Sequence, residues 1–104
     1  MPHKFLPLSV VLRYLPMMEA EGVSTVARSP RGFVTAYEQA RGNPRDLDAG
    51  WVRGREAFLA RHVAQLVQRD EPLYDEDGQP TRRHLALIAW AYSPDPRLPR
   101  PNLK

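Results

Sequence analysis

The sequence predicts an all-α fold, a compact bundle of four or five helices around a buried C-terminal helix. The longest apolar run extends from Leu85 to Tyr92, and a helix with apolar side chains on every side must be covered by the rest of the protein. Three alanines in this run favour helix over strand. Elsewhere, apolar residues recur at intervals of three and four, the spacing of amphipathic helices. We therefore expect one helical domain over residues 1–93 and a Pro-rich basic tail over residues 94–104.

The N-terminal part of the chain contains two expected helical segments. From Leu8 onward the apolar residues follow helical spacing, and Gly22 ends this first segment. Pro16 removes one backbone donor within it, so we expect a kink or two short helices there. Residues 23–28 form a second, short helical candidate with Ser24 as its N-cap.

Two further helices are expected in the middle of the chain, and the first has clear start and stop signals. Over about 30–41, Ser29-Pro30 supplies a capping residue and a residue suited to the first helical position, and Gly42 follows the end. The longest helix is expected over about 48–69, with Asp48 as its N-cap.

The C-terminal part combines a loop with the buried helix. Residues 70–80 are expected to form an exposed acidic loop with a turn at Asp77-Gly78, and the pattern over 73–81 is compatible with a small β-hairpin. The buried helix then spans about 83–92 and ends before Ser93-Pro94. The aromatic side chains expected in the core are Phe33, Tyr37, Trp51, Phe58 and Trp90.

Length and composition exclude several classes of protein. A chain of 104 residues with 42% apolar and 26% charged residues is typical of one globular domain. No apolar run approaches the roughly 18 residues of a membrane span. Pro7 and Arg13 interrupt the N-terminal stretch that most resembles a signal peptide, so we expect a cytoplasmic protein without a membrane partner. The absence of Cys excludes disulfides and thiolate metal sites.

Charge is distributed unevenly along the chain. Residues 70–80 carry five acidic residues and no base. The net charge of the whole chain is +3, so the residues outside this segment together carry a net charge of +8. Thirteen of the fifteen basic residues are Arg. A GC-rich genome favours Arg codons and would explain this bias. An anionic partner would explain it equally well, because the planar guanidinium group suits phosphate.

The long helix carries an anomaly on its apolar side. Arg55 and His62 fall within the same apolar arc as Trp51, and burial of an unpaired guanidinium group is very costly. One hypothesis is an anion pocket formed by Arg55, His62 and Trp51. The alternative is structural, with His62 bonded to a carbonyl group and Arg55 in an internal ion pair, for which the available carboxylates are Glu38, Asp46 and Asp48.

Two short segments allow both a functional and a structural interpretation. Residues 22–28, with the sequence Gly-Val-Ser-Thr-Val-Ala-Arg, resemble the turn and recognition-helix start of helix-turn-helix regulators, which implies contact with the DNA major groove. The alternative is a short connector. Arg82-Arg83-His84 opens the C-terminal helix, where cations oppose the helix dipole. Either the acidic loop folds back as a charge clamp, or these side chains contact a phosphate.

The sequence contains no catalytic or metal-binding pattern. It has no Gly-x-Ser-x-Gly, no phosphate-binding loop and no dinucleotide fingerprint, so we expect neither enzymatic activity nor a cofactor. The acidic loop lacks the first and last ligands of an EF-hand. His3, His62 and His84 lack metal-ligand spacing, and no metal site is expected. Pro96-x-x-Pro99 has the form of an SH3 ligand, but it also suits an ordinary chain terminus.

The leading functional hypothesis is a small, non-enzymatic nucleic-acid-binding or regulatory protein that contacts DNA or RNA phosphates through an Arg-rich face. The second is a protein-interaction adaptor or inhibitor, of the kind encoded by phages or plasmids, that uses the acidic loop 70–80 and the Pro-rich tail. The expected phosphate contacts, besides the basic tail, are Arg31, Arg41, Arg45, Arg53, Arg61, Arg82 and Arg83.

Overall fold

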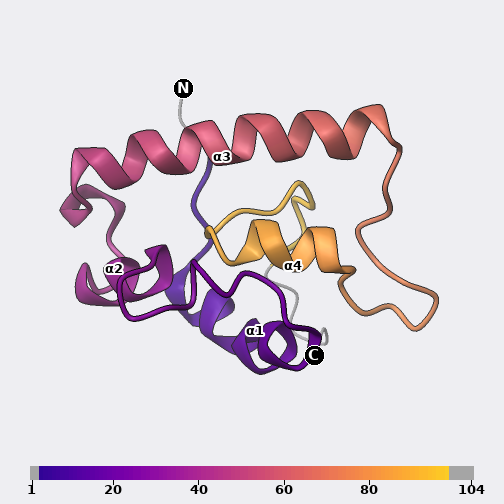
Figure 1. Ribbon diagram of the computed structural model, residues 1–104, viewed down its shortest axis with the longest axis horizontal. Coiled ribbons are helices and arrows are strands. Elements are labelled where there is room, and N and C mark those ends of the chain that lie inside the picture. Colours follow the sequence, from indigo (N-terminus) through magenta and orange to yellow (C-terminus); the bar gives the residue numbers. More distant parts are fainter. Residues whose placement is uncertain (1–2, 99–104) are drawn as a thin grey trace.

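The structure is a computed structural model, and it describes residues 3–98. Four α-helices follow one another in this part of the chain, with a 3-10 turn before the third: α1 (Leu8–Glu21), α2 (Phe33–Gln39), η1 (Pro44–Asp46), α3 (Ala49–Gln68) and α4 (Arg82–Ile88). α4 packs between α1 on one side and α3 on the other, and α1 also contacts α2 (Figure 1). The predicted all-α fold class is therefore confirmed. None of the described helices is long and apolar enough to cross a membrane.

α4 occupies the centre of the core, as its apolar sequence predicts. Leu87 and Ile88 are completely buried. The helix ends earlier than predicted, however, because Ala91 adopts a left-handed conformation with φ 59°. The Tyr92 N–H donates back to the Leu87 carbonyl oxygen at 3.2 Å, which is the pattern of a Schellman motif. As a result, the carbonyl groups of Trp90 and Ala91 lie beyond the helix and can accept hydrogen bonds from elsewhere.

α1 is one helix that contains Pro16, and the two short helices considered from the sequence are not formed. The Pro16 ring is exposed to solvent, and the helix continues to Glu21. Gly22 ends α1, as predicted, in the left-handed region with φ 65°. Its N–H donates to the Glu19 carbonyl oxygen at 3.1 Å, which satisfies one carbonyl of the last turn.

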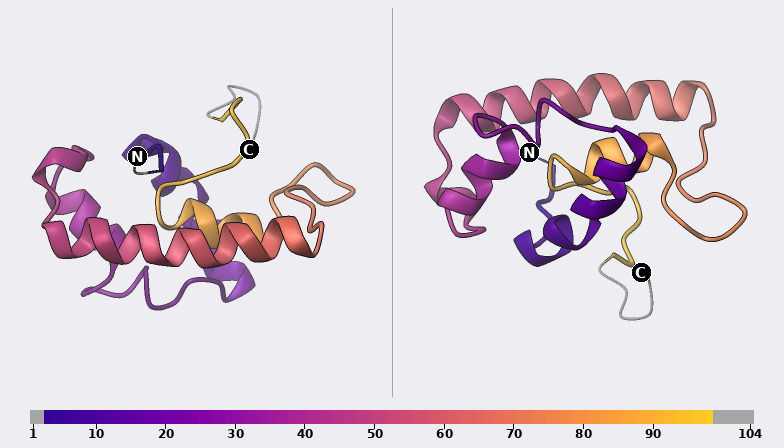
Figure 2. Two further views of the ribbon diagram at one scale, coloured as in Figure 1. Left: turned by 90° about the horizontal axis from the view of Figure 1, so that it is seen from above. Right: turned by 60° about the horizontal axis from the view of Figure 1, so that its bottom comes forward.

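The segment 22–32 connects α1 to α2 through turns, so the predicted short helix at 23–28 is wrong. Ser24 has φ 59°, whereas an N-cap residue takes an extended conformation. Gly32 approaches this segment so closely that a Cβ there would lie 2.2 Å from the Val26 carbonyl oxygen. Because residues 23–28 contain no recognition helix, the resemblance to helix-turn-helix regulators fails. Figure 2 shows this segment on one side of α3 and α4, with residues 91–98 on the other.

The boundaries of α2 and α3 agree only partly with the predictions. α2 begins at Phe33, after the expected Pro30, because the Ser29 hydroxyl donates to the Val26 carbonyl oxygen at 2.7 Å and does not cap the helix. Gly42 follows the end of α2 in the left-handed region, with φ 73°. α3 begins directly after Asp48, as predicted, although the Asp48 carboxylate makes no capping hydrogen bond.

The loop 70–80 contains one antiparallel β-bridge, between Tyr74 and Pro80, and no strand is formed within residues 3–98. The hairpin compatible with the sequence is thus reduced to a single bridge. Asp75 orders the turn, because its carboxylate accepts hydrogen bonds from two backbone N–H groups, each at 2.9 Å. Of the predicted tail, residues 94–98 are described, and Leu98 is buried against the body. Pro99 and the rest of the tail lie outside the described residues.

A column of stacked rings runs from α3 into the core. The His62 ring stacks on Phe58 with 4.0 Å between centroids, and Phe58 stacks on Trp90 at 4.9 Å. Trp90 stacks on Phe33 at 5.0 Å, and Phe33 on Tyr37 at 5.6 Å. Of the five aromatic side chains predicted for the core, Phe33 and Tyr37 are buried and the other three are half-buried. The end of the column at Phe58 and His62 therefore lies near the surface.

Candidate nucleic-acid interface

Arg55 lies in the first half of α3 and is completely buried, and each of its five N–H groups has an acceptor. Nε donates to the Trp90 carbonyl oxygen at 2.6 Å and Nη2 to that of Ala91 at 3.0 Å, the two groups beyond the end of α4. The other acceptors are the carbonyl oxygens of His3 and Lys4, both at 2.9 Å, and Oε2 of Glu56 at 3.1 Å. The guanidinium group thus joins the N-terminal segment, α3 and the segment after α4.

The charge of Arg55 is retained in this buried position. Burial lowers the pKa of Arg55 to about 10, and the charge of Glu56 opposes this effect, so the group stays protonated at neutral pH. Its Cζ also lies 3.6 Å from the centroid of the Phe5 ring. Glu56 accepts hydrogen bonds from the His3 backbone N–H at 2.8 Å and from Nδ1 of His3 at 2.6 Å. Burial alone would raise the pKa of Glu56, but the bonds from His3 lower it.

The three residues of the hypothetical anion pocket have separate partners. Arg55 has no donor left for an external anion, and His62 is bonded to Arg83. Trp51 packs against the rings of Phe33 and Trp90, with centroids 6.0 and 6.2 Å away. These side chains therefore do not form the anion pocket, and Arg55 has the structural role that was the alternative. The carboxylate beside it is its chain neighbour Glu56, instead of the more distant carboxylates considered from the sequence.

The two arginines at the start of α4 differ in how far they are engaged. Arg83 donates through Nε and Nη2 to the Glu71 carboxylate, at 3.2 and 3.0 Å, and its Nη1 lies 2.6 Å from Nδ1 of His62. This is the charge clamp by the acidic loop, and it lowers the pKa of Glu71. The Arg82 side chain is 64% exposed and lies 3.9 Å from the Glu21 carboxylate, with a further bond to the Glu21 carbonyl oxygen. Arg83 is therefore committed internally, whereas Arg82 still faces solvent.

The other five predicted phosphate contacts are exposed, and their side chains have no hydrogen bond or ion pair within residues 3–98. All but one belong to the segments that flank α2 or to the first half of α3. In Figure 1 these elements lie at one end of the molecule, and the acidic loop 70–80 forms the opposite end. The five are Arg31, Arg41, Arg45, Arg53 and Arg61.

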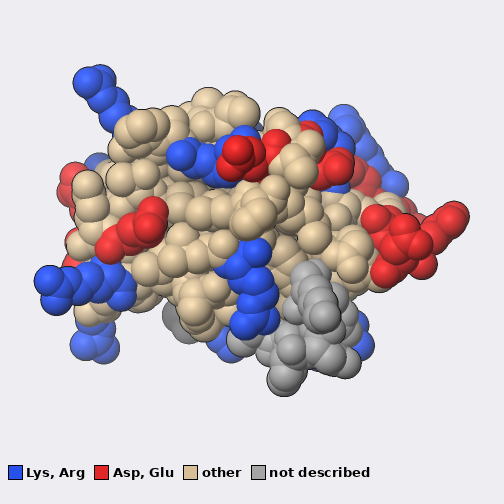
Figure 3. Space-filling model, turned by 90° about the horizontal axis from the view of Figure 1, so that it is seen from below, with Lys and Arg blue, Asp and Glu red and all other residues tan. Residues whose placement is uncertain are grey.

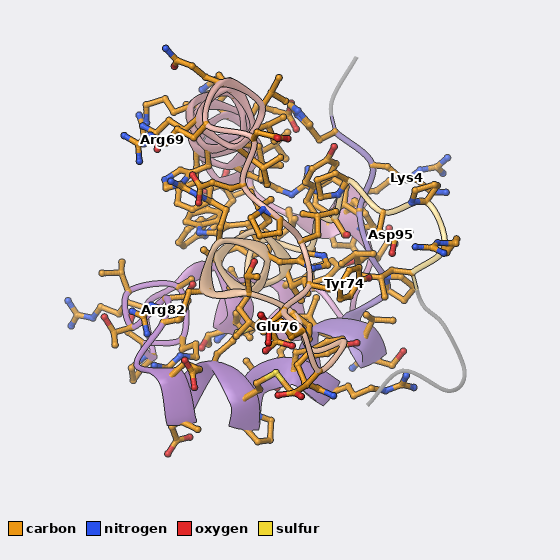
Figure 4. All side chains as sticks on the ribbon, turned by 90° about the vertical axis from the view of Figure 1, so that its right-hand side faces the viewer. Lys4, Arg69, Tyr74, Glu76, Arg82 and Asp95 are labelled. Atoms are coloured by element: carbon orange, nitrogen blue, oxygen red, sulfur yellow. The ribbon has the colours of Figure 1, made fainter. Side chains whose placement is uncertain are left out.

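The surface views show how these charges are spread. On the face in Figure 3, Lys and Arg side chains stand in separate groups. The largest acidic group lies at the end formed by the loop 70–80, and smaller acidic groups lie elsewhere on this face, including the opposite end. In Figure 4, Arg69 and Arg82 point to one side of the molecule, and Lys4 and Asp95 lie on the other. The face in Figure 3 therefore carries no single continuous basic patch.

A groove lies between the segment 22–27 and the helices α3 and α4. Its apolar part has a volume of about 360 Å³ and is lined by residues 24–27, Phe58, His62, Ala86 and Trp90. An adjoining part, lined by Arg82 and Arg83 among others, shares Ser24 and Ala86 with it. The outer end of the aromatic column thus forms one wall of the groove, and arginines stand at one end. Sequence reasoning assigned these aromatic rings to the core and missed the groove, because the path of residues 22–27 has no signature in the sequence.

A buried hydroxyl–imidazole pair holds the segment after α4. His84 is completely buried, and its Nδ1 lies 2.8 Å from the Leu73 carbonyl oxygen. Its Nε2 lies 2.7 Å from the Ser93 hydroxyl, which also accepts the Asp95 backbone N–H at 3.0 Å. Burial lowers the pKa of His84, so the ring is held neutral. This arrangement ties the acidic loop and the C-terminal segment to α4. The described part of the chain has no group of three metal-ligating side chains.

Comparison with protein-family models, with curated proteins and with solved structures found no match for this chain. The fold and the site together define an all-α protein with an acidic loop at one end and a groove lined by aromatic rings.

Proposed function

We propose that this chain is a small, non-enzymatic nucleic-acid-binding protein that contacts phosphates through arginines of α3 and of the segments that flank α2. The observation that carries this proposal is a contrast among the arginines. Arg55, Arg83 and Arg97 are paired with carboxylates. The five arginines from Arg31 to Arg61 named above are exposed and have no partner in the described part of the chain. A hydrated guanidinium group without an internal partner keeps its full capacity for bidentate bonds to phosphate.

The acidic loop supports the same proposal through its position. Asp75, Glu76 and Asp77 are exposed at the end of the molecule opposite α2 (Figure 1). They repel phosphates and so direct a nucleic acid towards the other end, where the unpaired arginines lie. The acidic loop can orient a polyanion in this way even though the net charge of the whole chain is only +3.

The test is fluorescence anisotropy of labelled single-stranded and duplex oligonucleotides across a salt series. We expect an affinity that falls log-linearly with salt, with a slope that reports the number of phosphates contacted, about 0.7 each for a single strand and 0.9 for a duplex. Absence of binding to both at about 50 mM salt would refute the proposal, because the electrostatic attraction is strong under these conditions.

A matched pair of variants locates the contacts. Arg61→Ala should weaken binding and lower the salt slope by about one phosphate contact. Arg13→Ala removes the same charge from an exposed helical position on α1, which lies across α4 from α3 (Figure 1). It should have a smaller effect. Equal effects of the two substitutions would show that binding depends on total charge and not on the side of the molecule that carries α3.

A second candidate function is that of a protein-interaction adaptor or inhibitor, for which we propose the acidic loop 70–80 and the Pro-rich tail as contacts. It is favoured by the order of the loop, in which the bridge at Tyr74 and the Asp75 turn present exposed carboxylates on a fixed backbone. A binding partner captured from the native host should be lost by the triple variant Asp75→Asn, Glu76→Gln, Asp77→Asn. Retention of that partner by the triple variant would contradict a role for the loop.

A further inference from the structure

The groove next to α4 combines an aromatic wall with nearby cations. Residues 24–27 form one side, and Phe58 and His62 of α3 form the other. We infer that this groove receives an unpaired base of a single-stranded nucleic acid, with the adjacent phosphate at Arg61 and Arg82. This inference rests on the proposed function, because it names the class of nucleic acid that the protein prefers.

The lining of the groove suits a flat, apolar ring. Its volume of about 360 Å³ falls within the range of ligand clefts, about 300–1,000 Å³. The rings of His62 and Phe58 stack 4.0 Å apart at an interplanar angle of 23°, and Trp90 continues the stack towards the core. A base placed against these rings would extend an aromatic column that already has fixed geometry. Stacking of this kind binds every base, but only when the base is unpaired.

His62 adds a hydrogen-bond donor to the wall. Its Nδ1 lies 2.6 Å from Nη1 of Arg83, and a guanidinium group can only donate. Nδ1 is therefore the acceptor, the ring is neutral, and the proton is on Nε2. Burial lowers the pKa of His62, and the charges of Arg83 and Arg61 lower it further, in keeping with this neutral form. Within residues 3–98, Nε2 has no acceptor, so it remains available for a carbonyl oxygen or ring nitrogen of a base.

The cations near the groove match the charge of a nucleotide phosphate. Arg83 lines the adjoining part of the groove, and Arg61 directly precedes His62 on α3, where the charges of both lower the pKa of His62. Glu71 neutralises Arg83, whereas Arg61 is exposed and unpaired within the described residues. Arg82 lines the adjoining part of the groove and is largely exposed. An apolar peptide would fit the rings but would leave Arg61 without a partner and Arg82 with Glu21 alone, so we propose a nucleotide as the ligand.

Val26 lines the groove, and its side chain is open to solvent. It is 78% exposed, and the one other large apolar side chain that is strongly exposed among residues 3–98 is Val67, at 70%. Val67 lies on α3 and does not line the groove. The two valines therefore supply a matched pair for substitution. Neither change should affect folding, because both side chains are already in water.

The experiment measures binding of three labelled probes of equal length by anisotropy at low salt: a single strand of oligo-dT, the same strand without bases, and a duplex. Oligo-dT should bind about fivefold or more tightly than the abasic strand, the smallest gain expected from one stacked base. In a Trp51→Phe background, Trp90 is the sole Trp, and its fluorescence should be quenched by oligo-dT and not by the abasic strand.

The valine pair then assigns the effect to the groove. Val26→Asp should weaken oligo-dT binding about fivefold more than Val67→Asp, because the new charge stands beside the bound nucleotide. Equal effects of the two substitutions, together with equal affinity for oligo-dT and the abasic strand, would refute base binding in the groove. The phosphate contacts of the proposed function would remain supported. Failure of all three probes to bind would overturn both. Tighter binding of the duplex than of oligo-dT would also contradict the inference that the groove receives an unpaired base.

Discussion

Replacement of Arg55 by Ala should destabilise the fold strongly, and the structure allows the size of the effect to be worked out. In Arg55→Ala, four backbone carbonyl oxygens lose the hydrogen bond from the guanidinium group. The Ala91 carbonyl oxygen still accepts a hydrogen bond from the Leu6 N–H at 2.7 Å. Among residues 3–98, no other donor is within hydrogen-bond distance of the remaining three, on His3, Lys4 and Trp90. At about 1–3 kcal/mol for each buried unsatisfied group, and towards the lower value for partly exposed ones, the loss is about 3–5 kcal/mol.

Urea unfolding followed by far-UV circular dichroism measures this loss. Arg53→Ala is the matched control, because Arg53 lies two residues earlier on the exposed side of α3, and its loss should change the unfolding free energy by no more than about 0.5 kcal/mol. Arg55→Lys keeps the charge but has three donors in place of five, so it should fall between the two. A loss of less than about 1 kcal/mol for Arg55→Ala would refute the conclusion that this side chain joins three segments of the fold.

Further predictions concern glycines and pH. Gly32→Ala should destabilise the fold, because the new Cβ would lie 2.2 Å from a backbone oxygen. Gly54→Ala should stabilise α3 by about 0.5–1 kcal/mol, because its Cβ would have no neighbour within 4 Å and Ala favours helix over Gly. Equal melting temperatures of the two variants would contradict both expectations. Because burial lowers the pKa of His84 in the folded state, its contribution to stability is full above its unfolded pKa of about 6.5 and is lost as the pH falls below that value. His84→Asn should therefore lose less stability than the wild type between pH 7 and 5, as measured by thermal melts. Burial alone would raise the pKa of Asp95, but bonds from Tyr74 and Arg97 lower it to about 2. Its contribution should persist at pH 5 and disappear between about pH 4 and 2, and Asp95→Asn should flatten that part of the profile.

The parts of the fold that could be predicted from the sequence are those fixed by local chemistry. The apolar run around Leu87 identified the central helix, Gly22 the end of α1, and Asp48 the start of α3. Each of these signals acts within one or two turns of its own position, so the sequence alone contains it. The prediction of a helix at 23–28 was wrong because close packing of Gly32 on this segment, a tertiary contact, outweighs a capping preference.

The environment of the candidate site could be predicted only in part. The clamp between Arg83 and the acidic loop follows from adjacent opposite charges and was one of two expected outcomes. The partners of Arg55 could not be foreseen, because most of them are backbone carbonyl groups, which every residue carries and no sequence pattern marks. The anomaly itself, a guanidinium group on an apolar helix face, was visible in the sequence and correctly marked a buried polar network.

The salt dependence of binding to a single strand, compared between the wild type and Arg53→Ala, Arg61→Ala, tests the central claim most directly. If these unpaired arginines each contact one phosphate, the slope of log affinity against log salt should decrease by about 1.4 in the double variant, with an unchanged melting temperature. An unchanged slope, or no binding by the wild type at about 50 mM salt, would contradict phosphate recognition by α3.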